Sequence, residues 1–392
     1  MIYLHEPFSD QIEKKYVLDC LKSNSLAQGK YIGLFEDRIK KILKVKYAVA
    51  CVNGTSALQI SVKLLNLKPQ EEIIVPTLTF ISPINAIHYN NLSPIFVDSD
   101  DNLNIDEEKV IRFIKNNTYK KLNKKDKSYI CFNKKTNKRI GAIVIVHTFG
   151  NPAKFDKLYP ICKRLNISII EDSAESFGTF YKNGLFKKKY TGSIGDIGCL
   201  SFNGNKIITS AGGGMIITNK FSFAKKARYL INQAKKDSLN FIHDDIGYNF
   251  RISNIHASIG YAQTLKFKKF VTKKELIHKN YKKFFSKSKK IKFYSPPDFA
   301  SSNYWLNLIY INFKKNNISK NKFIEKMNRQ NIQIRPIWKL NHLQKPYKSF
   351  QRFNISKALT IFNNYICLPS SVNLKYNQIQ IISKEIMNII DR

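Results

Sequence analysis

Lys206 stands in a setting that could make a lysine chemically reactive. The apolar run Ile197–Phe202 predicts a strand that ends at Ser201 and Phe202, the polar residues NGN follow it, and the glycines at 212–214 lead into a second strand. A lysine between polar residues is ordinarily a solvated surface group. Burial and neighbouring cations can lower the pKa of a lysine by several units, which makes its neutral amine available as a nucleophile and a base. Lys206 could do such chemistry if a phosphate and a carboxylate were held close to it.

A candidate phosphate site precedes this lysine in the chain. The segment VNGTSALQISVKLL, residues 52–65, follows a predicted strand and opens a helix. Gly54, Thr55 and Ser56 offer backbone N–H groups and hydroxyls at the positive end of that helix, which favours an anion. An ordinary helix cap would use the same residue types, so this segment alone does not decide between the two.

A candidate carboxylate lies between these two segments. The segment SIIEDSAESFGT, residues 168–179, ends a predicted strand with Glu171 and Asp172. A carboxylate at a strand end can pair with a cationic ring nitrogen, although an acid there also caps turns in many α/β proteins. Together, the three segments contain the parts of a pyridoxal phosphate site: a phosphate cradle, an acid for the ring nitrogen and a lysine that can hold the cofactor as a Schiff base.

The first two-thirds of the chain alternates between predicted strands and helices, which indicates an α/β fold with a largely parallel sheet covered on both faces. Ligands of such sheets lie beyond the carboxyl ends of the strands, where Asp98, His147 and Asp172 each end an apolar run. We predict strands at Ala48–Val52, Ile73–Pro76, Pro94–Asp98, Ala142–His147, Ser168–Asp172, Ile197–Phe202 and Gly214–Thr218. We predict helices at Thr55–Leu67, Ser82–Tyr89, Glu107–Asn116, Pro152–Leu165 and Phe223–Asn232.

The pattern changes beyond about Ser253, where longer basic helices alternate with a few strands such as Leu306–Phe313. We therefore expect a large cofactor-binding domain over residues 1–252 and a smaller C-terminal α+β domain over residues 253–392. The lysine-rich stretch from Asn117 to Arg139 is typical of a solvated surface hairpin.

The composition describes a folded basic protein. Of 392 residues, 43% are hydrophobic, and 66 Lys and Arg against 28 Asp and Glu give a formal net charge of +38. Such a charge can indicate a nucleic-acid partner. The excess is mostly lysine spread over the whole chain, with abundant Asn and Ile, so we interpret it as compositional drift and expect no specific nucleic acid. A basic surface would still attract an anionic substrate.

The sequence also bears on location and on metals. No apolar run approaches the roughly 18–20 residues of a membrane span, and the N-terminus lacks the pattern of a signal peptide. The six cysteines are scattered without a CxxC pair, which predicts free thiols in a reducing cytoplasm and no metal site.

The chain resembles the DegT–DnrJ–StrS sugar aminotransferases, a branch of the fold-type I pyridoxal phosphate enzymes, over nearly its whole length. The resemblance is carried by ordered motifs that include NGTSAL, VPTLTFISPINAI, PIFVDSD, VHTFGNP, EDSAESFG, GSIGDIGCLSFNGNKIIT, GYNFRISNIHASIG and IRPIWKLNHLQKPY.

The resemblance implies roles for particular residues. Lys206 would hold the cofactor and then carry protons, while Asp172 would pair with the ring nitrogen. Phe80 would stack on the ring. The phosphate would be bound by Gly54, Thr55, Ser56 and Ser201. Asn249 would reach the phosphate in the site of a partner subunit, which implies a homodimer with shared active sites.

One position departs from the family pattern. Glu175 stands where much of the family has glutamine near the cofactor ring. This puts a second carboxylate close to Asp172, so that either one of the two is protonated or Glu175 points away.

The resemblance also implies the reaction. An amino acid, by family habit L-glutamate, would donate its amino group, and a keto-sugar nucleotide would accept it. The motifs are most similar to those of the legionaminic-acid and bacillosamine-type enzymes, which aminate C4 of a UDP-4-keto-6-deoxy-N-acetylhexosamine for surface glycans.

Three alternatives remain. An aminotransferase of the same family could act at C3 or on a GDP- or dTDP-linked keto-sugar, as in perosamine formation. A sugar 3-dehydratase on this fold would have histidine in place of Lys206. A non-catalytic basic binding protein on this scaffold would be expected to have lost Lys206 or Asp172.

Overall fold

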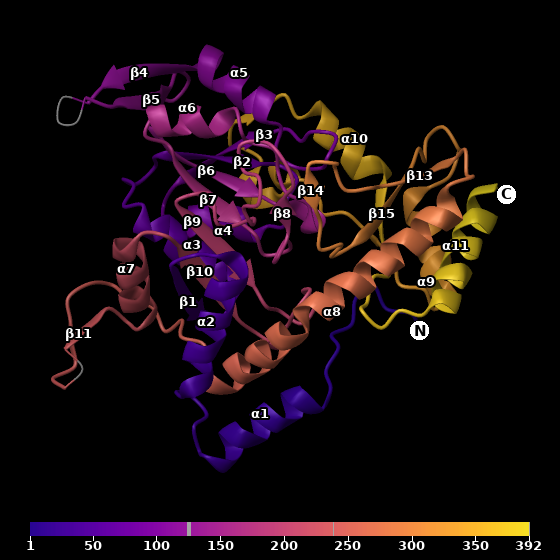
Figure 1. The fold of residues 1–392 in the computed structure, drawn as a ribbon. Helices are drawn as coiled ribbons and strands as arrows, with labels where there is room; N and C mark the ends of the chain where they lie inside the picture. The colour runs from indigo at the N-terminus through magenta and orange to yellow at the C-terminus, as the bar shows by residue number, and fades with distance from the viewer. Residues whose placement is uncertain (124–126, 238, 392) are drawn as a thin grey trace.

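A mostly parallel sheet forms the centre of the molecule in the computed structural model, which describes residues 1–123, 127–237 and 239–391. Within these residues the sheet has eight strands in the order β1-β10-β9-β7-β6-β2-β3-β17 (Figure 1). Their bounds are β1 Tyr47–Cys51, β2 Glu72–Pro76, β3 Ser93–Val97, β6 Ile140–Val146, β7 Ser168–Asp172, β9 Ile197–Ser201, β10 Gly214–Thr218 and β17 Arg352–Phe353.

The strand directions bring distant segments to one edge of this sheet. Neighbouring strands from β9 through β17 run parallel, whereas β10 is antiparallel to both β9 and β1. Gly214 at the start of β10 therefore pairs with Ser201 at the end of β9 and with Cys51 at the end of β1. The carboxyl ends of β1, β9, β7, β6, β2 and β3 all lie at this edge, together with the loops that follow them.

Helices cover both faces of the sheet because the strands are apolar on both sides. On one face, α3, α4 and α7 pack on alternate strand residues such as Val75, Val146 and Ile170. On the other face, α2 and the start of α8 cover the β1, β10 and β9 side, and α5 and α6 cover the β6, β7 and β2 side. The bounds are α2 Lys30–Leu43, α3 Gly54–Leu64, α4 Ser82–Tyr89, α5 Glu107–Asn117, α6 Leu158–Arg164, α7 Phe221–Ile231 and α8 Asn254–Phe285.

The predicted elements are present with small shifts at their ends. Each predicted strand of the large sheet lies within two residues of its observed bounds, because apolar runs with β-branched residues mark buried strands well. Two predicted helices were too long. α3 ends at Leu64 rather than Leu67, and α6 begins at Leu158 rather than Pro152, after a stretch that contains the one-turn helix η1, Thr148–Gly150. The helices α1 Gln11–Lys22 and α2 were not predicted, although Asp10 and Glu13 form a capping box that starts α1.

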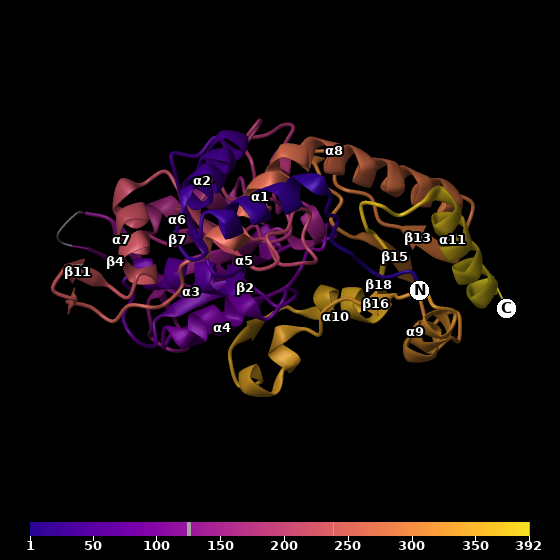
Figure 2. The ribbon, with the colours of Figure 1, turned by 90° about the horizontal axis from the view of Figure 1, so that it is seen from below.

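A smaller antiparallel sheet organises the C-terminal part of the chain. Its strand order is β13-β15-β18-β16, and α9, α11 and the end of α8 pack on it around one apolar cluster. Figure 2 shows α8 running from the large sheet to these C-terminal elements. The bounds are β13 Ile291–Phe293, β15 Asn307–Ile311, α9 Lys320–Arg329, β16 Arg335–Pro336, α10 Ser356–Asn364, β18 Tyr365–Leu368 and α11 Tyr376–Asp391. The observed fold is thus the predicted α/β arrangement with a smaller α+β part.

The large N-terminal part and the smaller C-terminal part each contribute segments that pair with the other part. The C-terminal strand β17 adds to the edge of the large sheet beside β3, and β14 Ala300–Ser301 pairs with β8 Phe180–Tyr181. In the other direction, Ile2 forms an isolated bridge with Ile332, so the N-terminus lies beside the segment that leads into β16. We keep residues 1–252 and 253–392 as a proposed division, with these crossing segments tying the two parts together.

Two hairpins extend from the body of the molecule. β4 Thr118–Leu122 and β5 Tyr129–Asn133 form the lysine-rich hairpin that the sequence predicted, of which residues 124–126 lie outside the described part. The second hairpin, β11 Lys235–Asp237 with β12 Ile242–His243, projects on the same side as α7 (Figures 1 and 2). Among the described residues, no helix is both long enough and apolar enough to span a membrane.

Candidate active site

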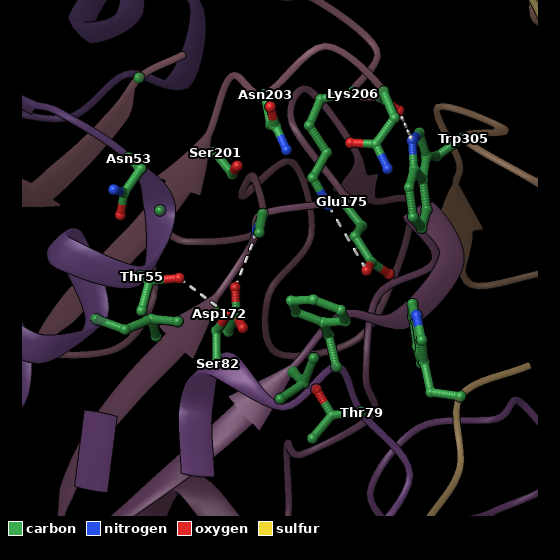
Figure 3. Close-up of a pocket in the computed structure, with 18 of the residues that line it drawn as sticks. Asn53, Thr55, Thr79, Ser82, Asp172, Glu175, Ser201, Asn203, Lys206 and Trp305 are labelled. Atoms are coloured by element: carbon green, nitrogen blue, oxygen red, sulfur yellow. Dashed lines mark hydrogen bonds and ion pairs between the residues drawn. The ribbon is translucent and has the colours of Figure 1, made fainter. Parts of the chain in front are cut away.

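A cavity of about 370 Å³ opens at the carboxyl edge of the large sheet. Most of the side chains that were predicted for the site line it, although they come from segments far apart in the sequence. The predicted residues among its lining are Gly54, Thr55, Phe80, Asp172, Glu175, Ser201 and Lys206. Figure 3 shows Thr55, Asn53 and Ser201 on one side of Asp172, and Trp305 on the far side of Lys206.

Lys206 reaches into this cavity from the loop that joins β9 to β10. Its side chain is only 13% exposed, and its Nζ lies 3.8 Å from Glu175 Oε1 and 4.4 Å from the centre of the Trp305 ring. The indole Nε1–H of Trp305 donates to the carbonyl oxygen of Asn205 over 2.6 Å, which fixes the ring beside the lysine. Lys206 is therefore a directed, enclosed amine and not a solvated surface group.

The strand β7 separates its two carboxylates, because consecutive residues of a strand point to opposite faces. Asp172 faces the cavity, where it accepts a hydrogen bond from Ala174 N over 3.1 Å. Burial raises the pKa of Asp172 above its usual value, although Lys206 and His147 oppose this rise. A cationic ring nitrogen beside Asp172 would supply the positive partner that a buried carboxylate needs.

Glu171 faces the other side of the sheet, and both of its carboxylate oxygens accept hydrogen bonds from the protein. Its Oε1 accepts from Ile194 N and Gly195 N, and its Oε2 accepts from Gly192 N and from the His147 ring at 2.9 Å. Asp98 is occupied as well, since its carboxylate contacts Lys109 and accepts from two backbone N–H groups at the start of α10. Of Asp98, His147, Glu171 and Asp172, only Asp172 lines the cavity.

Glu175 points into the cavity, next to Lys206. Its Oε2 accepts a hydrogen bond from Phe149 N over 2.8 Å. Burial raises the pKa of Glu175 to about 7, even though Lys206 and the Phe149 N–H favour its ionised form and therefore lower it. Near neutral pH this carboxyl group can therefore hold or release a proton 3.8 Å from the Lys206 amine.

The opposite end of the cavity is suited to a phosphate. Gly54 and Thr55 begin α3, whose first backbone N–H groups have no partners within the helix. A Cβ at Gly54 would lie 2.7 Å from the Cβ of Ser201, so glycine is what allows the helix to start this close to the end of β9. Thr55 Oγ1 lies 2.9 Å from Ser82 Oγ, which adds a further hydroxyl to the cluster.

Several lining residues were not predicted: Asn53, Leu58, Thr79, Ser82, Val146, Ala174, Asn203, Asn205, Gly212, Gly213, Trp305 and Trp338. Asn53 caps α3 by accepting from Ser56 N over 2.8 Å, a signal that its position before the helix already carried. Thr79, Ser82 and Trp338 lie within motifs that were recognised without a role. Nothing local in the sequence marks Trp305, which reaches the site only through the packing of the C-terminal part.

Two predicted residues do not line the cavity. The Ser56 N–H is bound by Asn53, and its side chain is buried in the first turn of α3. Asn249 is exposed and forms a bridge with Asn232, beyond the end of α7.

The cavity fits pyridoxal phosphate by the chemistry of its walls. It offers a carboxylate with little internal pairing at Asp172, an enclosed amine at Lys206, and a helix N-terminus with hydroxyls beyond Asp172. Thr79 Oγ1 is buried in the lining and has no hydrogen-bond partner among the described residues, as expected of a group that contacts a ligand. The Phe80 side chain is 52% exposed and leaves an aromatic face available to a ring.

Comparison with known proteins decides the family. The family model described as the DegT/DnrJ/EryC1/StrS aminotransferase family matches residues 7–387. The chain belongs to this family. Its members use pyridoxal phosphate, and this chain is a pyridoxal-phosphate-dependent nucleotide-sugar aminotransferase.

Individual members of the DegT/DnrJ/EryC1/StrS family are similar over most of the chain. The GDP-perosamine synthase of Escherichia coli O157:H7 is 32% identical, with 98% of this chain and 97% of that protein covered. The UDP-4-amino-4,6-dideoxy-N-acetyl-beta-L-altrosamine transaminase of Campylobacter jejuni is 30% identical over 73% of this chain and 70% of its own. Among solved structures, the Helicobacter pylori aminotransferase PseC, involved in the biosynthesis of pseudoaminic acid, superposes with a TM-score of 0.87 at 25% identity, covering 100% of this chain and 99% of its own.

Proposed function

We propose that this enzyme transfers the amino group of L-glutamate to C4 of a UDP-linked 4-keto-6-deoxy-N-acetylhexosamine, in the formation of surface-glycan amino sugars. The single observation that carries the amino transfer is the enclosed Lys206 amine, 3.8 Å from Glu175, in a cavity that Asp172 also lines. The UDP-linked acceptor is supported by the similarity to the UDP-4-amino-4,6-dideoxy-N-acetyl-beta-L-altrosamine transaminase of Campylobacter jejuni. When bound, pyridoxal phosphate supplies the carbon that carries the amino group and a ring that withdraws electrons from the reacting carbon.

The residues of the cavity have separate tasks in this proposal. Asp172 holds the positive charge of the ring nitrogen, a charge-assisted contact worth roughly 1.5–3 kcal/mol. The N-terminus of α3, with Gly54, Thr55 and Ser201, binds the phosphate, and Phe80 stacks on the ring.

Lys206 moves the proton. Lys206 would hold the cofactor through its Nζ. Once that amine is free, it would take the proton from the α-carbon of the amino donor and release it again within the cavity. For the sugar, Lys206 would move a proton in the opposite direction. Glu175 lies beside this amine with a pKa of about 7 and keeps the total charge around it low. Trp305 shields the amine from water on one side.

A second acceptor class is favoured by a specific observation. GDP-perosamine synthases of Escherichia coli O157:H7 and Vibrio cholerae are 32% and 30% identical to this chain over nearly their whole lengths. A GDP-linked 4-keto sugar is therefore the alternative acceptor. A 3-dehydratase is disfavoured, because that reaction would be expected to have histidine where Lys206 stands.

The acceptor is tested by incubating the purified enzyme with L-glutamate and a panel of UDP-, GDP- and dTDP-linked 3-keto and 4-keto sugars. Mass spectrometry then detects the amino sugar, and NMR assigns the aminated carbon. We expect turnover with the UDP-4-keto-6-deoxy-N-acetylhexosamine. Turnover confined to a GDP-linked or a 3-keto sugar would leave the aminotransferase intact and refute the acceptor that we propose.

We further propose that the active unit is a homodimer in which Asn249 reaches the phosphate of the partner's site. The β11–β12 hairpin before this residue exposes large apolar side chains, with Leu239, Phe241 and Ile246 exposed by 84%, 71% and 75%. Apolar side chains on a projecting hairpin are typical of a surface that another chain covers. Sedimentation analysis with parallel activity assays tests this, and a fully active monomer would contradict it.

A cytoplasmic location is part of the same proposal. All six cysteines are buried free thiols, the state that a reducing compartment maintains.

A further inference from the structure

A second cavity, of about 490 Å³, adjoins the first and is not explained by the cofactor. The two cavities share Asn205, Trp305 and Trp338 in their linings, so they adjoin one another at the two tryptophan side chains. Apolar residues including Leu306, Ile337 and Phe149 form much of the second cavity. We call it the His5 cavity, after the one histidine in its lining.

His5 is held in place by the C-terminal sheet. The backbone N–H of Leu4 donates to Gln333 Oε1, and the backbone N–H of Glu6 donates to Ser371 Oγ. Ser370 N donates in turn to the carbonyl oxygen of Leu4. Figure 2 shows the N-terminus beside β16 and β18, and its three partner residues lie just before β16 and just after β18. The position of His5 is therefore fixed on both sides along the chain.

The two ring nitrogens of His5 are buried, and their hydrogen-bonding capacity is unused within the described part of the chain. Both ring nitrogens are enclosed, and neither has a hydrogen-bond partner among the described residues. A buried polar group without a partner costs about 1–3 kcal/mol, so such groups are rare unless a ligand or water completes them. The ring lines the cavity, where a ligand could reach it.

The charge state of the ring narrows the ligand chemistry. Burial, together with the nearby ammonium groups of Lys274 and Lys206, holds the pKa of His5 well below its usual range. The ring is therefore neutral near pH 7 and offers one N–H donor and one nitrogen acceptor. That pair matches an amide or a hydroxyl group. An anion would use the donor only and would leave the other nitrogen unpaired.

The rest of the lining fits a sugar attached to a diphosphate. Aromatic rings such as those of Trp305 and Trp338 pack well against the C–H faces of a sugar. Arg335 and Lys339 also line the cavity and are exposed. Their positive charge could therefore bind the diphosphate of a sugar nucleotide at the point where it extends from the cavity into solvent. A free amino-acid donor would fill only part of a cavity of this size.

We propose that the His5 cavity binds the acceptor sugar and that His5 recognises an amide or hydroxyl substituent of that sugar by hydrogen bonding. The proposal rests on the proposed function, because it needs a nucleotide-linked keto sugar as the acceptor. The proposal makes His5 a specificity-determining residue outside the cofactor cavity. His5 is near the start of the chain, whereas most of the residues around it belong to the C-terminal part.

The test compares three variants of the whole enzyme. His5→Phe keeps an aromatic ring but removes both hydrogen-bonding groups, His5→Gln keeps one donor and one acceptor, and Tyr3→Phe is a control two residues away at an exposed site. Each variant is assayed with L-glutamate and the acceptor that the wild type uses best. A second measurement follows the reaction of the bound cofactor with glutamate alone.

We expect His5→Phe to raise KM for the sugar about tenfold, the effect of one lost hydrogen bond at the upper end of the usual range. His5→Gln should recover most of this loss, and Tyr3→Phe should behave as the wild type. The reaction with glutamate alone should be unchanged in every variant, which also shows that the variants are folded and hold the cofactor.

Analogues of the acceptor identify the sugar substituent that forms a hydrogen bond with His5. Removing the N-acetyl group or a single hydroxyl should raise KM in the wild type, and for one of these analogues the rise should disappear in His5→Phe. An unchanged KM for the sugar in His5→Phe, or an effect on the glutamate reaction instead, would overturn the proposal. If the wild type converts no sugar of the panel, the proposed function itself fails, and that outcome is distinct.

Discussion

Two clusters of buried ionisable side chains lie on opposite faces of β7, only one residue apart in the sequence. On one face, Glu171 accepts from three backbone N–H groups and from His147. Because Ala153 N donates to the Nδ1 of that histidine over 3.0 Å, its proton is on Nε2 and points to Glu171. Every polar atom in this cluster has a partner within the protein, so it can hold the loop Gly192–Gly195 against the sheet but has nothing left to offer a ligand.

The cluster on the other face is incomplete by comparison. Among the described residues, the carboxylate of Asp172 accepts one hydrogen bond and that of Glu175 accepts one from a backbone N–H, and Lys206 Nζ approaches Glu175 at 3.8 Å. Burial raises the pKa of both carboxyl groups. Incomplete pairing in a buried cluster costs stability but leaves groups free to bind a cofactor and to move protons. The contrast separates a structural cluster from a chemical one, and the following substitutions test it.

Lys206→Ala should have the largest effect. The chemical cluster then loses both its covalent anchor and its proton carrier, so transamination should fall by about a thousandfold or more. Lys206→Arg should be no better, because a guanidinium that stays charged can neither bind the cofactor covalently nor accept the proton. Steady-state rates measure the loss, with the exposed Lys187→Ala as a control.

The covalent anchor can be located independently of activity. Borohydride reduction of the wild type followed by peptide mapping should place the pyridoxyl label on Lys206. A label on any other lysine would refute the assignment of this cluster.

Asp172→Asn should slow the reaction without releasing the cofactor. An amide cannot stabilise the positive ring nitrogen, and the loss of a charge-assisted contact corresponds to a roughly 10- to 100-fold lower kcat. Spectroscopic titration should still show a bound cofactor, since the phosphate contacts and Lys206 remain. The exposed Asp101→Asn is the control, and an unchanged kcat in Asp172→Asn would mean that the cavity carboxylate has no electronic role.

Glu171→Gln should lower the stability of the protein more than its catalytic rate, unlike the substitutions at Lys206 and Asp172. Both oxygens of Glu171 face donors only, so an amide N–H₂ would meet another donor whichever way it turned. We expect the free energy of unfolding to fall by about 2–3 kcal/mol. Denaturant titration measures this, with Glu108→Gln at the surface as the control for little change. A loss of kcat in the folded variant, with stability retained, would contradict the division between the clusters.

Glu175→Gln should have the smallest effect, visible as a change in pH dependence. The carboxyl pKa rises from its usual 4.5 to about 7 in the folded protein. Between these values the folded state holds a proton that the unfolded chain has released, so the wild type loses stability as the pH rises from about 4.5 to 7. The shift corresponds to at most about 3 kcal/mol, and we expect about 1–2 kcal/mol because the group is coupled to Lys206.

Unfolding of the cofactor-free wild type and of Glu175→Gln, measured at several pH values, tests this prediction. The variant should gain stability relative to the wild type as the pH rises through the window. Parallel curves for the two proteins would show that Glu175 keeps an ordinary pKa.

The sequence alone determined the fold class, the family and the local chemistry of the site. The strands, the helix start at Gly54, the acid at Asp172 and the lysine at Lys206 are each encoded in a short segment. Hydrophobic periodicity and turn residues act over a few residues, so they could be read without the structure. The family motifs then supplied the cofactor and the type of reaction.

Only the tertiary structure decided which side chains face the cavity and what surrounds them. The local pattern did not separate Glu171 from Asp172, and only the family resemblance named Asp172. Strand pairing and helix packing set which face of β7 meets the ligand, and the structure shows that it is the face of Asp172. Trp305 and His5 reach the site from opposite ends of the chain, through contacts of the C-terminal sheet that leave no local pattern. The raised pKa of Glu175 likewise depends on burial, which arises only when these distant segments pack together.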